Sequence, residues 1–149
     1  MRAGTENVPG TVGIGKAAEC SAKILKQKME YEQKLQQYLI DRLREEIPGL
    51  VLNGSERHRL PNNVNVSIRG INGPALVALL DLEGICASSG SACAHGNGKP
   101  SHVQLAIGKN EEEAYQAVRF TLGIQNTKEE LEDTVNAVRN CVQRLRTAY

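Results

Sequence analysis

Apolar side chains recur at helical spacing in the first third of the chain. They alternate with charged residues and consist of Tyr31, Leu35, Leu39, Leu43 and Ile47. Pro48-Gly49 ends this pattern, because proline cannot continue a helix. The Pro9-Gly10 pair suits a helix start, where the missing N–H of proline costs little. We therefore predict an irregular lead-in followed by one long helix that ends near Ile47.

A second helical pattern closes the chain. Thr127, with Glu130 three residues later, forms a capping box at its start. Acidic residues gather near its beginning and arginines near its end, as the helix dipole favours. Its apolar stripe consists of Leu131, Val135, Val138, Val142 and Leu145. This segment is predicted to be an amphipathic helix that packs on a core.

Strict alternation marks a half-buried strand in the middle of the chain. Val64, Val66 and Ile68 are apolar, whereas Asn65 and Ser67 between them are polar. Shorter strands are predicted at residues 50–52, 85–87 and 118–122.

Three further helix starts lie between the strands. They are predicted at Asn72-Gly73-Pro74, at Ser101 with Gln104 as a capping box, and at Asn110 with Glu113 as another. Gly84 and Gly108 stop the first two of these helices. The resulting pattern predicts an α/β domain of two layers (α+β), with a small sheet and helices packed on one face.

Composition argues against several classes of partner. The 149 residues carry a formal net charge of +1, so no strong field favours nucleic acid or a membrane surface. No apolar run reaches transmembrane length, and the first ten residues lack the apolar core of a signal peptide. The cysteines, at positions 20, 86, 93 and 141, form no CxxC pair. We therefore expect reduced thiols in a cytoplasmic protein.

Cys93 stands out because of its surroundings. No side chain from Ser88 to Pro100 is large and apolar, and glycines lie on both sides of the cysteine. A long segment of this kind is usually functional or disordered. Nearby cations and a helix start would lower the pKa of a thiol. We interpret Cys93 as a mobile nucleophile; a plain surface cysteine is the alternative.

A zinc site is a weaker interpretation of the same segment. Cys86, Cys93 and His95 offer only three local ligands, and their spacing matches no standard structural site. Cys86 follows an apolar residue in a strand-like pattern and is predicted to lie in the core. We expect no bound metal.

Arg119 interrupts an otherwise apolar strand pattern. Its guanidinium must face water or meet an anion, because an unpaired buried charge is costly. Arginine is also the side chain best shaped to hold a carboxylate with two hydrogen bonds. Thr5 lies in a polar stretch that precedes a helix start and could meet a phosphate there. Simple strand alternation and a disordered N-terminus are the respective alternatives.

Several stretches together resemble the C-terminal portion of pyridoxal-phosphate-dependent cysteine desulfurases. The likeness is to the iron–sulfur-cluster and nitrogen-fixation branch of these class V aminotransferase-like enzymes. The string Ser88-Ser89-Gly90-Ser91-Ala92-Cys93 is a specific match. The other matching stretches are residues 2–10, 60–67, 100–103 and 119–123. The resemblance covers nearly the whole chain, in the order of the family.

The resemblance implies a fold and a role for each candidate residue. It implies the small C-terminal domain of a fold-type I pyridoxal-phosphate enzyme, acting on L-cysteine. Cys93 would accept the substrate sulfur as a persulfide while L-alanine leaves. Arg119 would hold the substrate carboxylate, and Thr5 would reach the cofactor phosphate of a neighbouring subunit. A homodimer and a sulfur acceptor, such as an iron–sulfur scaffold protein, would be the partners.

The chain also departs from that family. The large domain, which carries the cofactor-binding lysine, has no counterpart here. Residues 1–15 would be a lead-in and interdomain segment, and residues 16–149 the small domain. Ala94-His95 stands where the family often has small hydroxyl residues, so the role of His95 stays open. Three interpretations remain. The chain is the C-terminal part of a desulfurase (a truncated product, a fragment or half of a split enzyme), a non-catalytic sulfur-relay module, or a regulatory or structural remnant that binds a partner.

Overall fold

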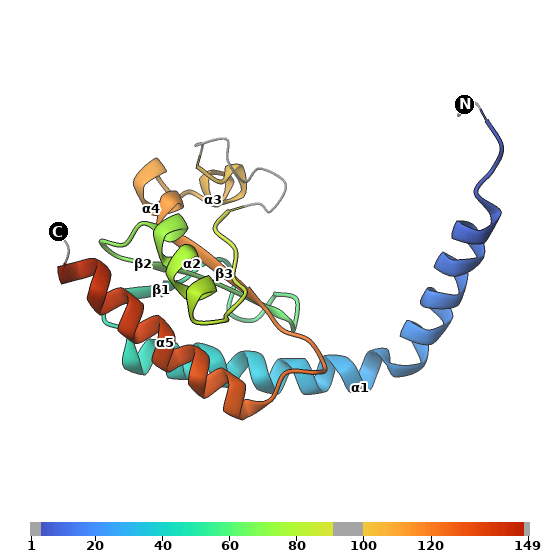
Figure 1. The fold of residues 1–149 in the computed structure, drawn as a ribbon, viewed down its shortest axis with the longest axis horizontal. Helices are drawn as coiled ribbons and strands as arrows, with labels where there is room; N and C mark the ends of the chain where they lie inside the picture. Colours follow the sequence, from blue (N-terminus) through green and yellow to red (C-terminus); the bar gives the residue numbers. More distant parts are fainter. Residues whose placement is uncertain (1–3, 91–99, 148–149) are drawn as a thin grey trace.

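A computed structural model describes residues 4–90 and 100–147, so Cys93 and His95 lie outside the described residues. The elements, in chain order, are α1 (Val8–Glu46), β1 (Leu50–Leu52), β2 (Asn63–Ile68), α2 (Gly73–Leu82), α3 (His102–Ala106), α4 (Glu111–Tyr115), β3 (Ala117–Thr121) and α5 (Lys128–Thr147) (Figure 1). The described strands form one antiparallel sheet in the order β1-β2-β3. The predicted mixture of a small sheet and helices is confirmed.

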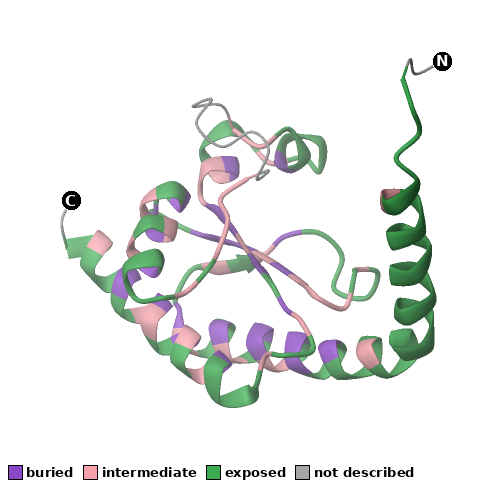
Figure 2. Ribbon diagram, turned by 45° about the vertical axis from the view of Figure 1, so that its right-hand side comes forward, coloured by how far each residue is buried: buried purple, intermediate pink, exposed green. Residues whose placement is uncertain are grey.

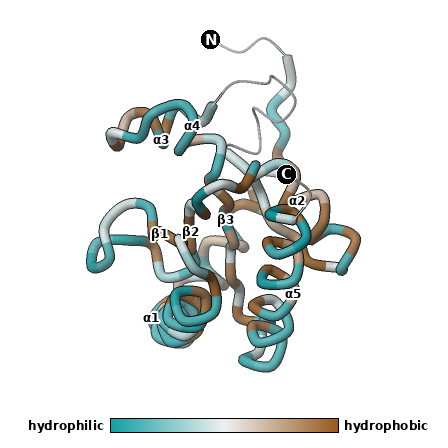
Figure 3. The backbone as a smooth tube through the Cα atoms, turned by 90° about the vertical axis from the view of Figure 1, so that its left-hand side faces the viewer, coloured by the Kyte–Doolittle hydropathy of each residue, from teal (hydrophilic) through white to brown (hydrophobic). Residues whose placement is uncertain are grey.

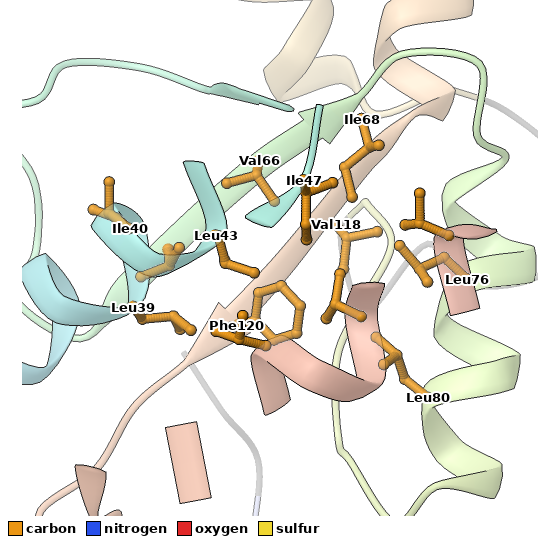
Figure 4. Packing of buried hydrophobic residues seen from close by; sticks show 14 of the residues in the cluster. Leu39, Ile40, Leu43, Ile47, Val66, Ile68, Leu76, Leu80, Val118 and Phe120 are labelled. Atoms are coloured by element: carbon orange, nitrogen blue, oxygen red, sulfur yellow. The ribbon is translucent and has the colours of Figure 1, made fainter. Parts of the chain in front are cut away.

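One face of the sheet carries the core. Val64, Val66 and Ile68 of β2 are fully buried against α1, α2 and α5. Figure 4 shows leucines of α1 and α2 pointing toward Val118 and Phe120 of β3. The apolar stripe of α5 is buried as predicted, apart from the partly buried Leu145. The long helices therefore pack on one face, and Figure 3 shows α3 and α4 on the opposite side of the strands from α5.

Gly73 marks a close approach between the start of α2 and strand β3. A Cβ atom at this position would lie 2.6 Å from the carbonyl oxygen of Tyr115 and 2.7 Å from that of Ala117. Both oxygens belong to the backbone, so neither can rotate away. The chain can therefore bring α2 against β3 only with glycine at position 73.

We expect Gly73→Ala to destabilise the domain by about 1–3 kcal/mol, because a methyl group would be forced against rigid backbone. Chemical denaturation measures this change. Gly13→Ala is the matched control: nothing lies within 4 Å of its added Cβ, and alanine favours a helix over glycine. Equal stabilities for Gly73→Ala and the unmodified chain would contradict the close approach.

An ion-pair cluster joins α1 to α5. Arg42 Nε donates to Glu132 Oε1 at 2.8 Å, and the Tyr38 hydroxyl donates to the same carboxylate. Arg139 Nη1 donates to Glu46 Oε2 at 2.9 Å. The hydrogen bonds from Arg42 and Tyr38 lower the pKa of Glu132 to about 2. Glu132 is one-third exposed, so salt screens part of this interaction.

The lowered pKa of Glu132 makes the domain acid-sensitive. Its contribution to stability is complete above the ordinary pKa of 4.5 and is lost as the pH falls toward about 2. The sign follows because the unfolded chain binds the proton more readily in that window. We expect the denaturation midpoint to fall across this range, and to fall less in Glu132→Gln and in added salt. The same pH profile in Glu132→Gln would contradict the role of this carboxylate.

Helix α1 extends beyond the core that its C-terminal half covers. Residues 11–27 are all exposed, and Figure 2 shows this part of α1 rising away from the domain. Asn7 caps the helix start, with its side chain accepting a hydrogen bond from the Gly10 amide at 3.1 Å. The predicted long helix is confirmed, and it begins at Val8. No helix in the described ranges has the length and apolarity that a membrane crossing requires.

Three local predictions were wrong. Residues 85–87 form no strand; only Ser88 makes an isolated bridge, to Arg119. Cys86 is exposed rather than buried, because it lies between α2 and this bridge, where the chain runs along the surface. Ser101 precedes α3 without a side-chain capping bond, and Gln104 does not complete the predicted box because its side chain donates to Asn65 on the sheet. The boxes at Asn110 and Thr127 are present as predicted.

Candidate functional site

The second face of the sheet is polar. Asn65 of β2 pairs directly with Arg119 of β3, so their side chains share the face opposite the core. Ser67 lies two residues further along β2 on the same face and is buried. Alternation therefore places an amide, a hydroxyl and a guanidinium together on one side of two strands.

Hydrogen bonds tie these polar groups to neighbouring segments. Asn53, which follows β1, donates to Asn65 Oδ1 at 2.7 Å and to Ser67 Oγ at 2.9 Å. Ser67 Oγ also lies 3.3 Å from the carbonyl oxygen of Glu113, to which it donates. Gln104 Nε2 of α3 donates to Asn65 Oδ1 at 3.1 Å. These residues fix α3 and α4 to the sheet through buried polar contacts.

Arg119 holds its place through its backbone. Its amide donates to the Ser88 carbonyl at 2.7 Å, and the Ser88 amide donates to the Arg119 carbonyl at 3.0 Å. Its side chain is half-buried, and its Nε is buried without a hydrogen-bond partner in the described part of the chain. An unpaired buried donor is costly, and more so on a charged group. The guanidinium therefore has unused capacity to bind an anion.

Both described flanks of the segment that contains Cys93 are attached to this polar face. Ser88, five residues before the cysteine, is bonded to β3 through Arg119. Gln104, eleven residues after it, is bonded to β2 through Asn65. The ends of the segment are therefore anchored on neighbouring strands, beside Arg119.

Thr5 is not joined to this face. It is exposed and lies three residues before α1, whose first half stands away from the domain. No hydrogen bond between described residues links Thr5 to Arg119 or to its neighbours. The structure therefore brings together Arg119 and the flanks of Cys93, whereas Thr5 stands apart.

The other cysteines differ in environment. Cys20 and Cys86 are exposed, whereas Cys141 lies buried in α5. Burial is the main cause that raises the pKa of the Cys141 thiol, which disfavours the reactive thiolate. Among the described residues, no group of three or more His, Cys, Asp or Glu side chains could hold a metal ion. Two of the residues in the zinc hypothesis, Cys93 and His95, lie outside the described part.

The described residues do not form a complete pyridoxal-phosphate site. Such a site needs a lysine held in a cavity beside the cofactor. Every described lysine is exposed or half-exposed, and Lys16 and Lys23 are paired with Glu19 on the outer surface of α1. Thr5 and Arg119 could therefore contact a cofactor or its substrate only from the edge of a site that other residues complete.

The sequence predicts only part of the polar cluster around Asn65. Asn65 and Ser67 were visible as the polar half of an alternating strand, which predicts a wet face rather than a buried one. Gln104 was interpreted as a capping residue, because its spacing from Ser101 fits a capping box. Asn53 lies in a polar stretch that carries no distinctive pattern.

Comparisons with known proteins agree on one family. The model of the aminotransferase class-V family matches residues 1–133. A cysteine desulfurase IscS of Dictyoglomus turgidum is 41% identical over 98% of this chain and 37% of its own length. A cysteine desulfurase IscS of Methanosarcina thermophila is 43% identical over 97% of this chain and 36% of its own length.

The solved structures give the same result. A NifS-like protein from Rickettsia africae superimposes with a TM-score of 0.83 and 30% identity, covering 95% of this chain and 36% of that protein. A second NifS-like protein superimposes with a TM-score of 0.80 over 95% of this chain. This chain thus spans a little over a third of the length of the relatives it matches. With a match over residues 1–133 and this shared fold, the chain belongs to the aminotransferase class-V family.

Proposed function

We propose that this chain is the small-domain part of a cysteine desulfurase, with Cys93 as the sulfur acceptor and Arg119 as the carboxylate-binding residue. The main support for this proposal is the polar face of the sheet. It holds a guanidinium with an unpartnered buried Nε, and both described flanks of Cys93 are attached beside it. The chain's similarity to cysteine desulfurases, at 41–43% identity over nearly the whole chain, supports the same activity.

The chemistry assigns one task to each residue. The guanidinium of Arg119 binds the carboxylate of L-cysteine and fixes the orientation of the substrate. The thiolate of Cys93 attacks the substrate sulfur, so an S–S bond forms while the carbon–sulfur bond breaks. The carbon retains the bonding electron pair and takes up a proton, which gives L-alanine. Pyridoxal phosphate, when bound, supplies the electron sink that makes this cleavage possible.

The exposed half of α1 supports a partner in the complete enzyme. Its exposed apolar side chains are Val8, Val12, Ile14, Ile24, Leu25 and Met29. Exposed apolar side chains in such number are typical of an interaction surface. We assign it to contacts with the large domain or with a second subunit, where Thr5 would reach the cofactor phosphate. We further propose that the enzyme works in the cytoplasm and passes its sulfur to an iron–sulfur scaffold protein.

We expect the purified 149-residue chain to fold but to show no sustained turnover of L-cysteine with added pyridoxal phosphate. No lysine in the described ranges is held in a cavity where it could bind the cofactor, so no stoichiometric imine absorbance should develop. Addition of a large domain from a related desulfurase should restore alanine and sulfide production. Persulfide uptake from a donor, without such restoration, would favour a sulfur-relay module. Sustained turnover by the chain alone would contradict the need for a large domain.

A further inference from the structure

Two buried polar atoms on the same face of the sheet lack a partner among the described residues. One is Nε of Arg119, which carries a hydrogen and can only donate. The other is Oε1 of Gln104, which can only accept. A buried group of either kind costs free energy while it stays unpaired. The two are complementary in hydrogen bonding.

A short chain of contacts connects the side chains that carry these atoms. Gln104 Nε2 donates to Asn65 Oδ1 at 3.1 Å, and Asn65 is the residue directly opposite Arg119 across the β2–β3 pair. Residues that face each other in this way have Cβ atoms about 5 Å apart. Asn53 donates to the same Asn65 oxygen at 2.7 Å and so fixes the orientation of that amide. Gln104 is therefore held close to Arg119 by a residue that contacts both elements.

Gln104 is also the only buried residue of α3. Val103, Leu105 and Ile107 beside it are exposed, although they are apolar. The side chain that a helix buries against a sheet is usually apolar. Here a single amide takes that place and leaves its carbonyl oxygen free beside an arginine, which indicates a role other than packing.

We propose that Gln104 is a positioning residue for Arg119: its Oε1 accepts the Nε–H of the guanidinium when Arg119 binds a carboxylate. This contact pairs both unpartnered atoms. With Nε occupied, the two terminal nitrogens of the guanidinium remain for end-on, two-bond contact with the carboxylate. The inference rests on the proposed role of Arg119. It adds a residue that orients the two terminal nitrogens of the Arg119 guanidinium.

The test uses the isotope-labelled 149-residue chain, with propionate and L-alanine as probes of carboxylate binding. The Arg119 Nε–H resonance is assigned by its loss in Arg119→Lys. With saturating propionate, we expect its hydrogen to exchange with water about tenfold more slowly than that of exposed Arg57. Gln104→Leu should abolish this protection and weaken propionate binding about threefold to tenfold.

A second variant separates positioning from simple structural support. Gln104→Glu keeps an acceptor at the same place, so the Nε–H protection should persist. Its negative charge competes with the probe, so propionate affinity should fall by about tenfold or more. A variant that had merely lost its structure would lose the Nε–H protection together with propionate binding. The matched control is Val103→Leu, an exposed substitution on the same helix, which should change neither readout; backbone amide spectra check the fold of every variant.

The outcomes distinguish this inference from the proposed function. Protection that depends on Gln104, in a chain that binds neither probe, supports the pairing and counts against carboxylate binding by Arg119 without the residues that complete the site. Propionate binding with equal affinity in the unmodified chain and in both Gln104 variants overturns the pairing, and leaves the proposed function standing. Unchanged Nε–H protection in Gln104→Leu overturns it as well.

Discussion

Replacing Cys93 by serine is expected to abolish persulfide formation on this chain. A serine hydroxyl neither ionises near neutral pH nor accepts a sulfur atom as a persulfide, so no residual transfer to position 93 remains. The chain is incubated with a persulfide donor, and the added sulfur is located by mass spectrometry of peptides. In the unmodified chain the label should lie on Cys93; in Cys93→Ser it should fall to background.

The other cysteines provide the controls. Cys20→Ser and Cys86→Ser remove exposed thiols and should leave the label on Cys93 unchanged. Cys141 is left unchanged, because it should not compete with Cys93 for the sulfur. Burial raises the pKa of its thiol and keeps the thiol from the donor. Label found chiefly on Cys86 or Cys20 would remove Cys93 from the proposed role.

Arg119→Lys is expected to weaken substrate binding about tenfold to a hundredfold. Lysine retains the charge but loses the planar fork, so at least one charge-assisted hydrogen bond to the carboxylate is lost, worth about 1.5–3 kcal/mol. The measurement is the dissociation constant for L-cysteine in an enzyme that contains this chain together with a cofactor-binding large domain.

Arg57→Lys is the matched control for that substitution. Arg57 is exposed in the turn-rich segment between β1 and β2, and the same exchange there should leave the affinity unchanged. If Arg119→Lys binds L-cysteine as tightly as Arg57→Lys, the guanidinium does not hold the substrate.

The sequence predicts those elements whose formation depends on the spacing of neighbouring residues. Alternation at Val64, Val66 and Ile68 predicts a strand with one buried face, and four-residue spacing from Leu35 to Ile47 predicts the buried side of α1. The capping boxes at Asn110 and Thr127 follow from hydrogen bonds between residues three apart. Arg119 was identified because a charged side chain interrupts an apolar run.

The rest depends on contacts between distant residues. Gln104 fits a capping box by spacing, yet its side chain reaches Asn65, 39 residues earlier in the chain. Cys86 follows an apolar residue, but its exposure depends on where the bridge between Ser88 and Arg119 begins. The free Nε of Arg119 is likewise a property of assembled neighbours. Such tertiary pairings are not encoded in any short window of the sequence.

The exposed half of α1 gives this chain two melting processes instead of one. Residues 11–27 are all exposed in the described structure, and Gly13, Gly15 and their β-branched neighbours are weak helix formers. Its local support comes from the Asn7 cap and the exposed ion pairs of Glu19. This half therefore unwinds gradually on warming, because a helix without packing is marginal in water. Far-ultraviolet circular dichroism sums that gradual loss with the cooperative melting of the core, whereas the absorbance of Phe120 and of Tyr38, which packs against the core, follows the core alone. A two-state free energy for this chain thus describes the packed domain, and the helical arm needs a separate baseline.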